Sequence, residues 1–426
     1  MTPSKKPRVG AVIPALSRTP ARIRWITTAL SPLLAVALLA SCTASPHEPA
    51  RTPLSPSDPA VTRIVREAMA DHNLRAVIVE VTKDGRTLAR EAFGESVTGV
   101  PATPDMHFRN GAVAFAYIGT LLMEYVDERK VELDDTIDRW EPALPDASRV
   151  TLRMLADQTS GYPDYETDPT WTASFNADPL HMFTYQERLA SAFARPAQFA
   201  PGTNWSYSHT NFMILGDILA KIGGAPLETL LKRKVLEPMG LRSTVANEGS
   251  DIPAPVLHTF SSERRGALGI PADVPFTEEA TFWNSQWGTP MGANQTTTID
   301  DLTTTAIKVG TGALLSRSSY HAMTDASLIG FGERGPSCAP SCFPQTVRYN
   351  YGLGVVRSGD WILQNPSLSG LSATEAYLPS EKLSIAVVIT FKPAAFDADG
   401  NYQAYQSTQL FQQLGAHFAP DDAPPT

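Results

Sequence analysis

The sequence predicts a mixed α/β (α+β) domain in which both ends of the chain build one antiparallel sheet and a mainly helical region is inserted between them. Residues Ala76–Val81 and Thr87–Phe93 are rich in strand-forming residues and are joined by the turn Lys83-Asp84-Gly85, which indicates a strand pair. More strand-like segments follow residue 349, whereas apolar residues in the middle of the chain recur at helical spacing. This arrangement favours a single sheet that both ends of the chain complete.

The other elements are predicted from local signals along the chain. Asp58-Pro59 can cap and begin a first helix, and Gly223-Gly224 can end a helix over Asn211–Ile222. Arg149–Tyr165 is expected to hold a short helix followed by a loop, and residues 251–294 show few regular patterns. Further helices are expected over Pro226–Val235, Thr297–Gly310, Ser316–Thr324 and Tyr402–Phe418, and further strands over Tyr351–Arg357, Asp360–Gln364, Ala373–Leu378 and Leu383–Thr390.

The first 41 residues are predicted to be an export signal. Residues 1–24 are basic and contain no acidic residue, and Trp25–Ala40 is a short apolar stretch that ends in small residues. The segment Leu39-Ala40-Ser41-Cys42 resembles the lipobox of bacterial lipoproteins, which implies cleavage before Cys42 and a lipid on its thiol. An ordinary signal peptide followed by a chance cysteine, or an uncleaved anchor, is the alternative.

The rest of the chain is then divided by composition. Residues 42–59 are rich in Pro and Ser and form a tether. Residues 60–420 form the domain, with 60–135 and 345–420 as its sheet part and 136–344 as the mainly helical insertion. Residues 421–426 are a short tail.

The composition indicates a globular, acidic domain. Of the 426 residues, 42% are hydrophobic and 19% are charged, which is enough apolar sequence for a large core. There are 35 Lys and Arg against 44 Asp and Glu, and six of the basic residues precede residue 42. A nucleic-acid partner is therefore not expected, because its binding needs basic residues that neutralise phosphates. The eight histidines show no metal-ligand spacing and there is no glycine-rich phosphate loop, so neither a metal nor a cofactor is expected.

The two cysteines besides Cys42 are Cys338 and Cys342. In an exported protein such a pair favours a disulfide. Because they are four positions apart, the bond would close a short surface loop and add little global stability. Two thiols without a histidine nearby do not make a zinc site.

The segment Ala112–Val126 is almost uniformly apolar, which predicts a helix in the middle of the domain. Around it lies an ordered set of motifs that covers roughly residues 60–420: FRNGAVAF, LRMLADQTSGYPDY, FAPGTNWSYSHTNFMILGDI, PMGLRST, TTTIDDL, YGLGV and AYLP. This set resembles the penicillin-recognising serine hydrolases, and more narrowly the penicillin-binding, class C β-lactamase and D-alanyl-D-alanine carboxypeptidase group. The resemblance implies a β-lactamase/transpeptidase-like fold, with the site between the sheet part and the helical part.

Members of this family use Ser-x-x-Lys at the start of the buried helix, Tyr-x-Asn on a loop, and His/Lys-x-Gly on a strand beside the cleft. Here the first motif falls on Ala112-Val113-Ala114-Phe115, so that Ala replaces the nucleophile and Phe replaces the Lys. No lysine in the chain has a serine three positions before it, so a shifted alignment does not restore this motif. The former active-site positions are Ala112, Phe115, Tyr207, His209, Gln364 and Pro366, and of these only the tyrosine is retained.

We therefore expect an exported protein that is lipid-anchored to the outer face of the cell membrane. We expect it to be a non-catalytic pseudoenzyme that binds a peptidoglycan peptide or an envelope protein through the former cleft. Loss of a serine nucleophile costs roughly 10⁶ in rate in a triad enzyme, and alanine cannot form an acyl-enzyme.

Two alternatives stay open. In one, the chain is an active serine-type hydrolase with a relocated nucleophile. His209 would then polarise the hydroxyl group of Ser206, Tyr207 or Ser208. The sequence, however, shows no acidic partner for this histidine. In the other, it is a structural lipoprotein that has lost ligand binding.

Several other residues have a structural and a functional interpretation. Ser160 is interpreted as packed in a loop under the cleft rather than as a nucleophile, and Phe115 is expected to fill the cleft floor with its ring. Four aromatic residues are interpreted as core in preference to a sugar- or peptide-binding surface: Trp171, Phe175, Trp283 and Trp287.

Overall fold

The structure is a computed structural model that describes residues 58–247, 249–284, 288–335, 338 and 341–426. The predicted export signal, Cys42 and most of the tether lie outside the described residues, as does Trp287. Across the described ranges, no helix combines the length and the apolar character that a membrane span needs.

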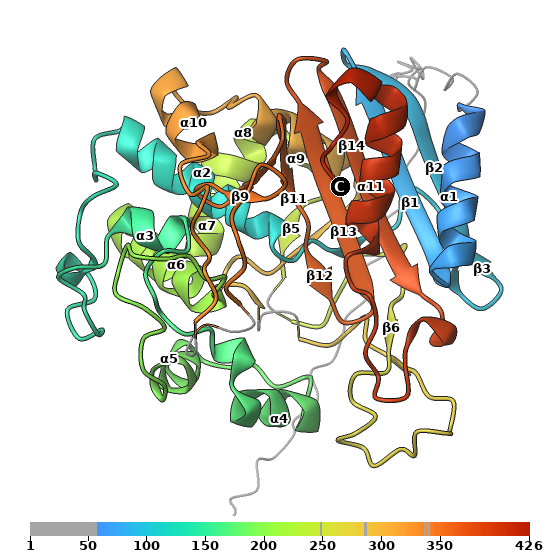
Figure 1. The fold of residues 1–426 in the computed structure, drawn as a ribbon, viewed down its shortest axis with the longest axis horizontal. Helices are drawn as coiled ribbons and strands as arrows, with labels where there is room; N and C mark the ends of the chain where they lie inside the picture. Colours follow the sequence, from blue (N-terminus) through green and yellow to red (C-terminus); the bar gives the residue numbers. More distant parts are fainter. Residues whose placement is uncertain (1–57, 248, 285–287, 336–337, 339–340) are drawn as a thin grey trace, which may run out of the picture. The chain divides into compact units, whose positions relative to one another are not determined.

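The main sheet is antiparallel and is built from both ends of the domain, which confirms the predicted fold class (Figure 1). Strand β1 (Leu74–Lys83) pairs with β2 (Arg86–Val97) on one side and with β14 (Leu383–Phe391) on the other, and Val79 lies opposite Val387. The strand order is β3-β2-β1-β14-β13-β11-β10-β9, and β12 pairs with β13. The remaining strands of this sheet are β3 (Val100–Pro101), β9 (Asn350–Tyr351), β10 (Val356–Ser358), β11 (Trp361–Gln364), β12 (Ser367–Leu368) and β13 (Leu371–Leu378).

The predicted strand over Tyr351–Arg357 is two short strands. A tight turn separates β9 from β10, in which the Gly352 amide donates to the Val355 carbonyl at 2.8 Å and Gly354 has a φ of +82°. Two small sheets lie apart from the main one. They contain β4 (Phe108–Arg109), β5 (Val245–Ala246) and β8 (Gln295–Thr297), and β6 (Phe260–Ser261) with β7 (Glu278–Glu279).

Helices cover both faces of the main sheet. Helices α1 (Pro59–Asp71) and α11 (Gln406–Phe418) contact each other and lie in front of it in Figure 1, and α9 (Ile299–Gly310) packs behind it. All residues of β13 and β14 are buried, as expected for strands covered on both sides. Helix α1 begins as predicted, because the Asp58 carboxylate accepts from the Ala60 amide at 2.9 Å.

The helical part is organised around α2 (Val113–Asp127), in which every residue except Glu124, Val126 and Asp127 is buried. Gly119 lies in the middle of this helix because a Cβ there would be 2.1 Å from the carbonyl oxygen of Leu353. The other helices of this part are α3 (Leu152–Ala156), α6 (His209–Gly223), α7 (Leu227–Leu231), a π-helical turn (Lys232–Leu236), α8 (Glu237–Met239) and α10 (Arg317–Thr324).

Two helices were not predicted, α4 (Pro169–Ala177) and α5 (Tyr185–Phe193). Both carry start signals in the sequence. Asp168 precedes Pro169 and accepts from the first amides of α4, and Thr184 with Glu187 forms a capping box at the start of α5. Their apolar faces are short, which is why the periodicity did not reveal them.

These helices cover a small aromatic core. Trp171, Phe175 and Trp283 are 7%, 9% and 7% exposed, and the Trp171 and Phe175 rings stack with centroids 5.8 Å apart. The interpretation of these residues as core is thereby confirmed.

Candidate functional site

A cavity of about 650 Å³ lies where the starts of α2 and α6 meet the segment that joins β11 to β12. Five of the six former active-site positions line it, although they are far apart in the sequence: Ala112, Tyr207, His209, Gln364 and Pro366. The other lining residues are Gly111, Asp164, Glu166, Thr167, Gly288, Thr289, Ser341, Phe343, Tyr349, Asn365, Ser367, Leu368 and Tyr405. The three altered motifs therefore share one open cavity.

Ala112 is the N-cap residue of α2 and has no side-chain cap hydrogen bond. The amide of Ala114 donates to the carbonyl oxygen of Gly111 at 3.1 Å, and that of Phe115 donates to Ala112 at 2.9 Å. In the predicted motif alignment, the Ala112 methyl group stands at the position of the nucleophile. Since a methyl group has neither a lone pair nor an acidic proton, this position supports no acyl transfer.

Phe115 lies beneath the floor of the cavity, outside its lining, and leaves the cavity open. Its side chain is 0% exposed, and its ring stacks on Phe212 with centroids 4.0 Å apart and an angle of 7° between the planes. The centroids of Tyr207 and His209 are 6.3 and 6.1 Å away. Phe115 therefore lies beneath the floor in an aromatic layer, because stacking there buries its whole surface.

Tyr207 lines the cavity as a neutral phenol. Burial raises its pKa well above the ordinary value, and the neighbouring Tyr351 and Tyr349 add to this effect. None of the cavity-lining residues that the structure describes is Lys or Arg, so neither of these side chains stabilises a phenolate from the lining. Tyr207 is thus suited to donate a hydrogen bond and unsuited to remove a proton.

His209 has two acidic partners that the sequence did not reveal. Its Nδ1 is 2.9 Å from Asp164 Oδ2 and 3.3 Å from Glu166 Oε2. Burial lowers the pKa of His209, but the charges of Glu166 and Asp164 outweigh burial and raise it to about 9. At neutral pH the ring is an imidazolium, which cannot take a proton from a hydroxyl group. The spacing Asp-x-Glu in the loop after Ser160 was the available sequence signal.

Asp164, Glu166 and His209 are not arranged as a metal site. No group of three or more His, Cys, Asp or Glu side chains in the described part of the chain is arranged to hold a metal ion.

The serines considered as alternative nucleophiles lie outside the cavity lining. Ser160 is 1% exposed and its hydroxyl donates to Asn211 Oδ1 at 2.5 Å, which places it in a buried network under α6. Ser206 donates to the Ser341 hydroxyl at 2.9 Å, and Ser208 is 0% exposed. The contacts of Ser160 and Ser206 assign these two hydroxyl groups to packing, whereas the Ser208 hydroxyl is buried without a hydrogen-bond partner among the described residues.

The residues of the third motif line the cavity at the end of β11. Gln364 ends β11, is 3% exposed, and donates from Nε2 to the carbonyl oxygen of Gly354 at 2.6 Å. The Cβ of Pro366 is 2.9 Å from the position that a Cβ on Gly111 would take. Pro366 therefore packs against the start of α2 where a glycine would leave room for a ligand.

Cys338 and Cys342 form a disulfide in the structure. The segment around it contributes Ser341 and Phe343 to the cavity wall, and the Tyr207 amide donates to the Ser341 carbonyl at 3.2 Å. The disulfide therefore closes the loop that carries Ser341, and Ser341 and Phe343 of this segment line the cavity.

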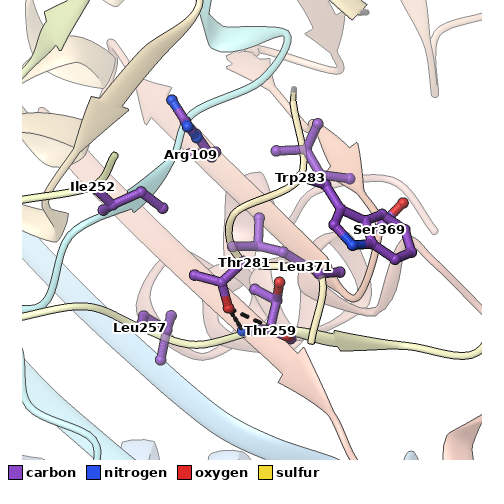
Figure 2. A pocket seen from close by; sticks show the side chains of 10 residues that line it. Arg109, Ile252, Leu257, Thr259, Thr281, Trp283, Ser369 and Leu371 are labelled. Carbon is purple, nitrogen blue, oxygen red and sulfur yellow. Dashed lines mark hydrogen bonds between the residues drawn. The ribbon is translucent and has the colours of Figure 1, made fainter. Parts of the chain in front are cut away.

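A second cavity, of about 30 Å³, lies beside the β12–β13 hairpin (Figure 2). Its wall includes Thr259 and Thr281, and the Thr281 hydroxyl accepts from the Thr259 amide at 2.8 Å. The Arg109 guanidinium at its edge donates to the carbonyl oxygens of Asn247 and Gly249. This volume has room for one or two water molecules and none for a ligand of peptide size.

Comparison with known proteins supports one family. The Beta-lactamase family model matches residues 61–409. A D-aminopeptidase of Gluconobacter oxydans is 26% identical over 354 residues, which cover 80% of this chain and 59% of that protein. A putative D-alanyl-D-alanine carboxypeptidase of Escherichia coli is 28% identical over 177 residues, 38% of each protein. The chain thus matches about three-fifths or less of the length of these curated relatives.

Solved structures share the fold. A D-stereospecific amidohydrolase from a Streptomyces species superposes with a TM-score of 0.69 at 21% identity, over 86% of this chain and 99% of that chain. Because the family model covers most of the sequence and the fold agrees, this chain belongs to the Beta-lactamase family.

Proposed function

We propose that the chain is a non-acylating member of the Beta-lactamase family that binds a peptide in the cavity between α2, α6 and β11. The observation that carries this proposal is an open cavity of about 650 Å³, within the usual range for ligand sites, with the Ala112 methyl group where the family has its nucleophile.

The surrounding residues support the same function. The Lys position is occupied by Phe115 stacked on Phe212, the pKa of Tyr207 is raised, and the imidazolium of His209 is paired with carboxylates. The residues at the nucleophile and base positions are thus replaced, whereas the tyrosine of the second motif is retained as Tyr207. Each replacement is packed or paired, which indicates a remodelled site and not a single disabling mutation.

The ligand class follows from the relatives. Those described above are named for D-aminopeptidase and D-alanyl-D-alanine carboxypeptidase activities. We therefore propose short peptides that contain D-amino acids, such as peptidoglycan stem peptides, as ligands. A peptide segment of an envelope protein is the second ligand type.

We also propose that the protein is exported and anchored to the outer face of the cell membrane by a lipid on Cys42. The basic start, the apolar stretch and the Leu-Ala-Ser-Cys sequence support this location. Cell fractionation of the wild type and the Cys42→Ala variant tests it, with the variant expected to leave the membrane fraction. Retention of both proteins in the membrane would contradict lipid anchoring at this cysteine.

Two measurements on the full chain test the proposed function. Fluorescent penicillin and a fluorophosphonate probe are expected to leave no covalent label, whereas titration calorimetry with D-Ala-D-Ala peptides is expected to show saturable binding. The Ala112→Leu variant should weaken binding because its side chain enters the cavity, and Ala112→Ser, which adds one atom, is the matched control. Covalent labelling near residue 112 would overturn the proposal. Absence of stabilisation by any peptide in a thermal-shift screen would favour a structural role.

The second candidate is a hydrolase with a relocated nucleophile, and the Asp164–His209 pair at 2.9 Å is the observation that favours it. Because the pKa of His209 is about 9, this candidate predicts ester hydrolysis that increases as the pH approaches 9. Single substitutions of Tyr207, Ser208 and His209 test it. Hydrolysis that survives all three would exclude this mechanism.

A further inference from the structure

We propose that the helical part carries a second ligand site, which binds a hydrophobic organic cation, that is, a molecule with an apolar body and one positively charged head. The site is a pocket of about 310 Å³ between α5, α6, the start of α7 and residues 290–292, called the helical pocket below. It is separate from the cavity between α2, α6 and β11, and the proposal does not depend on the peptide-binding function. The enclosure of the pocket, its apolar lining and the sign of its charges support it.

A single segment of chain separates the helical pocket from the larger cavity. Gly288 and Thr289 line the cavity, whereas residues 290–292 line the pocket, and the two described linings have no residue in common. Arg188 fixes this segment to α5, because its Nη1 donates to the carbonyl oxygen of Thr289 at 2.7 Å. The two spaces can therefore be tested independently.

Two glycines let this segment approach the helices closely. A Cβ on Gly216 of α6 would lie 2.8 Å from the Cβ of Pro290, and a Cβ on Gly292 would lie 2.6 Å from the backbone nitrogen of Glu228. Gly292 also has a φ of +87°, which glycine adopts without strain. Backbone packing therefore determines the shape of the pocket, and its volume lies within the usual range for ligand sites.

Most of the lining is apolar. Met213 and Leu227 are buried, and Met291 is 53% exposed and borders the opening. Ala220 and the half-buried Tyr185 also line the pocket. An apolar body that replaces water here gains free energy, and methionine side chains pack well against an aromatic ring. The lining thus suits a ligand with an aromatic or alkyl body.

The carboxylates at the pocket favour a cationic head. Glu228 lines the pocket, is exposed, and has no ion-pair partner among the described residues. Asp217 also lines it and pairs with Lys221 at 2.9 Å, and Lys221 pairs in turn with Glu141. Three carboxylates thus share one ammonium group at this edge. A ligand cation balances the remaining negative charge, whereas a ligand anion would be repelled.

The remaining polar groups of the lining agree with this sign. Arg188 is the single basic residue among the described lining residues, is 0% exposed, and donates to two backbone carbonyl oxygens. It therefore offers no exposed guanidinium to a ligand carboxylate. Burial raises the pKa of the Tyr185 phenol, and the charges of Glu141 and Asp217 raise it further, as expected where the electrostatic potential is negative.

Calorimetry on the full chain with three ligands of similar size tests the charge preference. They are benzyltrimethylammonium, whose quaternary head has no N–H donor, neutral 2-phenylethanol, and 3-phenylpropanoate, which carries a carboxylate. The cation is expected to bind saturably and about fivefold tighter than the alcohol, and salt at about 0.5 M should reduce this preference because exposed charges are screened. Absence of saturable cation binding, or equal binding of the carboxylate ligand, would overturn the proposal.

Two variants that fill space locate the site. Ala220→Leu places a larger side chain in the helical pocket and should lower the cation affinity about tenfold, whereas Ala112→Leu fills the other cavity and should leave it unchanged. Met291→Ala removes part of the exposed border, should lower the affinity about threefold, and serves if Ala220→Leu does not fold. Cation binding that is lost in Ala112→Leu, or retained in both pocket variants, would contradict this location.

A charge-removing variant tests the contact of the cationic head. Glu228→Gln should lower the affinity for benzyltrimethylammonium about threefold and leave that for 2-phenylethanol unchanged, since an exposed carboxylate contributes modestly. Glu237→Gln, at an exposed position outside the lining, is the matched control and should change neither affinity. An undiminished cation preference in Glu228→Gln would overturn the assignment of the head to this carboxylate.

Discussion

Replacing Phe115 by Lys would return the family's basic residue to the floor of the site, and the structure predicts that the protein would lose stability without gaining activity. The Phe115 side chain is 0% exposed and stacks on Phe212 at 4.0 Å between ring centroids. A lysine ammonium would have to enter this aromatic layer. The nearest charged ring is the imidazolium of His209, whose centroid is 6.1 Å from that of Phe115, so it would repel the new charge.

The expected loss follows from three contributions. Removing a buried phenylalanine ring costs about 3–5 kcal/mol, of which the aromatic pair accounts for about 0.5–1.5 kcal/mol. The lysine methylene groups recover part of the packing, but an ammonium buried without a carboxylate partner costs several kcal/mol more. The free energy of unfolding is therefore expected to fall by about 4 kcal/mol or more. Phe115→Leu, which keeps an apolar side chain, is expected to cost only about 1–1.5 kcal/mol.

Urea unfolding followed by tryptophan fluorescence measures these differences for Phe115→Lys, Phe115→Leu and Ala112→Ser. The serine variant is expected to stay within about 0.5 kcal/mol of wild type and to remain unlabelled by fluorescent penicillin, because no base is beside it. A Phe115→Lys variant as stable as wild type, or penicillin labelling of the Ala112→Ser/Phe115→Lys double variant, would refute the reasoning. The site would then be a recently disabled enzyme.

Three further predictions concern the surroundings of the site. The pKa of His209 in the folded state is raised from 6.5 to about 9, so the stability that its ion pair contributes is complete below about pH 6.5 and is lost as the pH rises through 9. The free energies of unfolding of wild type and His209→Gln, measured in urea, should therefore differ by about 2–3 kcal/mol more at pH 6 than at pH 9.5. An equal difference at the two pH values would speak against the ion pair. Reducing the Cys338–Cys342 disulfide should lower the free energy of unfolding by about 2 kcal/mol at most, because the closed loop is short. Urea unfolding with and without reductant measures this difference, and a larger loss would show that the loop stabilises the fold more than its length implies. Gly119→Ala should lower the free energy of unfolding by about 2–3 kcal/mol, because the new methyl group would lie 2.1 Å from a backbone carbonyl oxygen. The control Gly266→Ala, where the methyl group would enter open space, should change the midpoint of thermal unfolding little. Similar midpoints for the two variants would contradict the close packing of α2.

Much of the scaffold could be predicted from the sequence because it depends on local patterns. The apolar run of α2 has no polar face, so its place in the interior was the only favourable one. The strand-forming residues of β1 and β2, the turn between them and the apolar run of β14 specified strands at both ends of the domain, and their pairing completes the predicted sheet. The expectation that residue 112 is not a nucleophile also came from the sequence, because the covalent structure makes this residue an alanine.

The state of the site depended on contacts between distant residues, which no local pattern encodes. The sequence left open whether Phe115 blocks the cleft; its ring stacks on Phe212 of another helix, and the cavity stays open. The acidic partners of His209 come from a loop more than forty residues earlier in the chain, and their approach to 2.9 and 3.3 Å determines the charge of the ring. Composition and periodicity predicted most of the elements, whereas side-chain packing and electrostatics between those elements determined that the predicted site positions line an open cavity with an acidic wall.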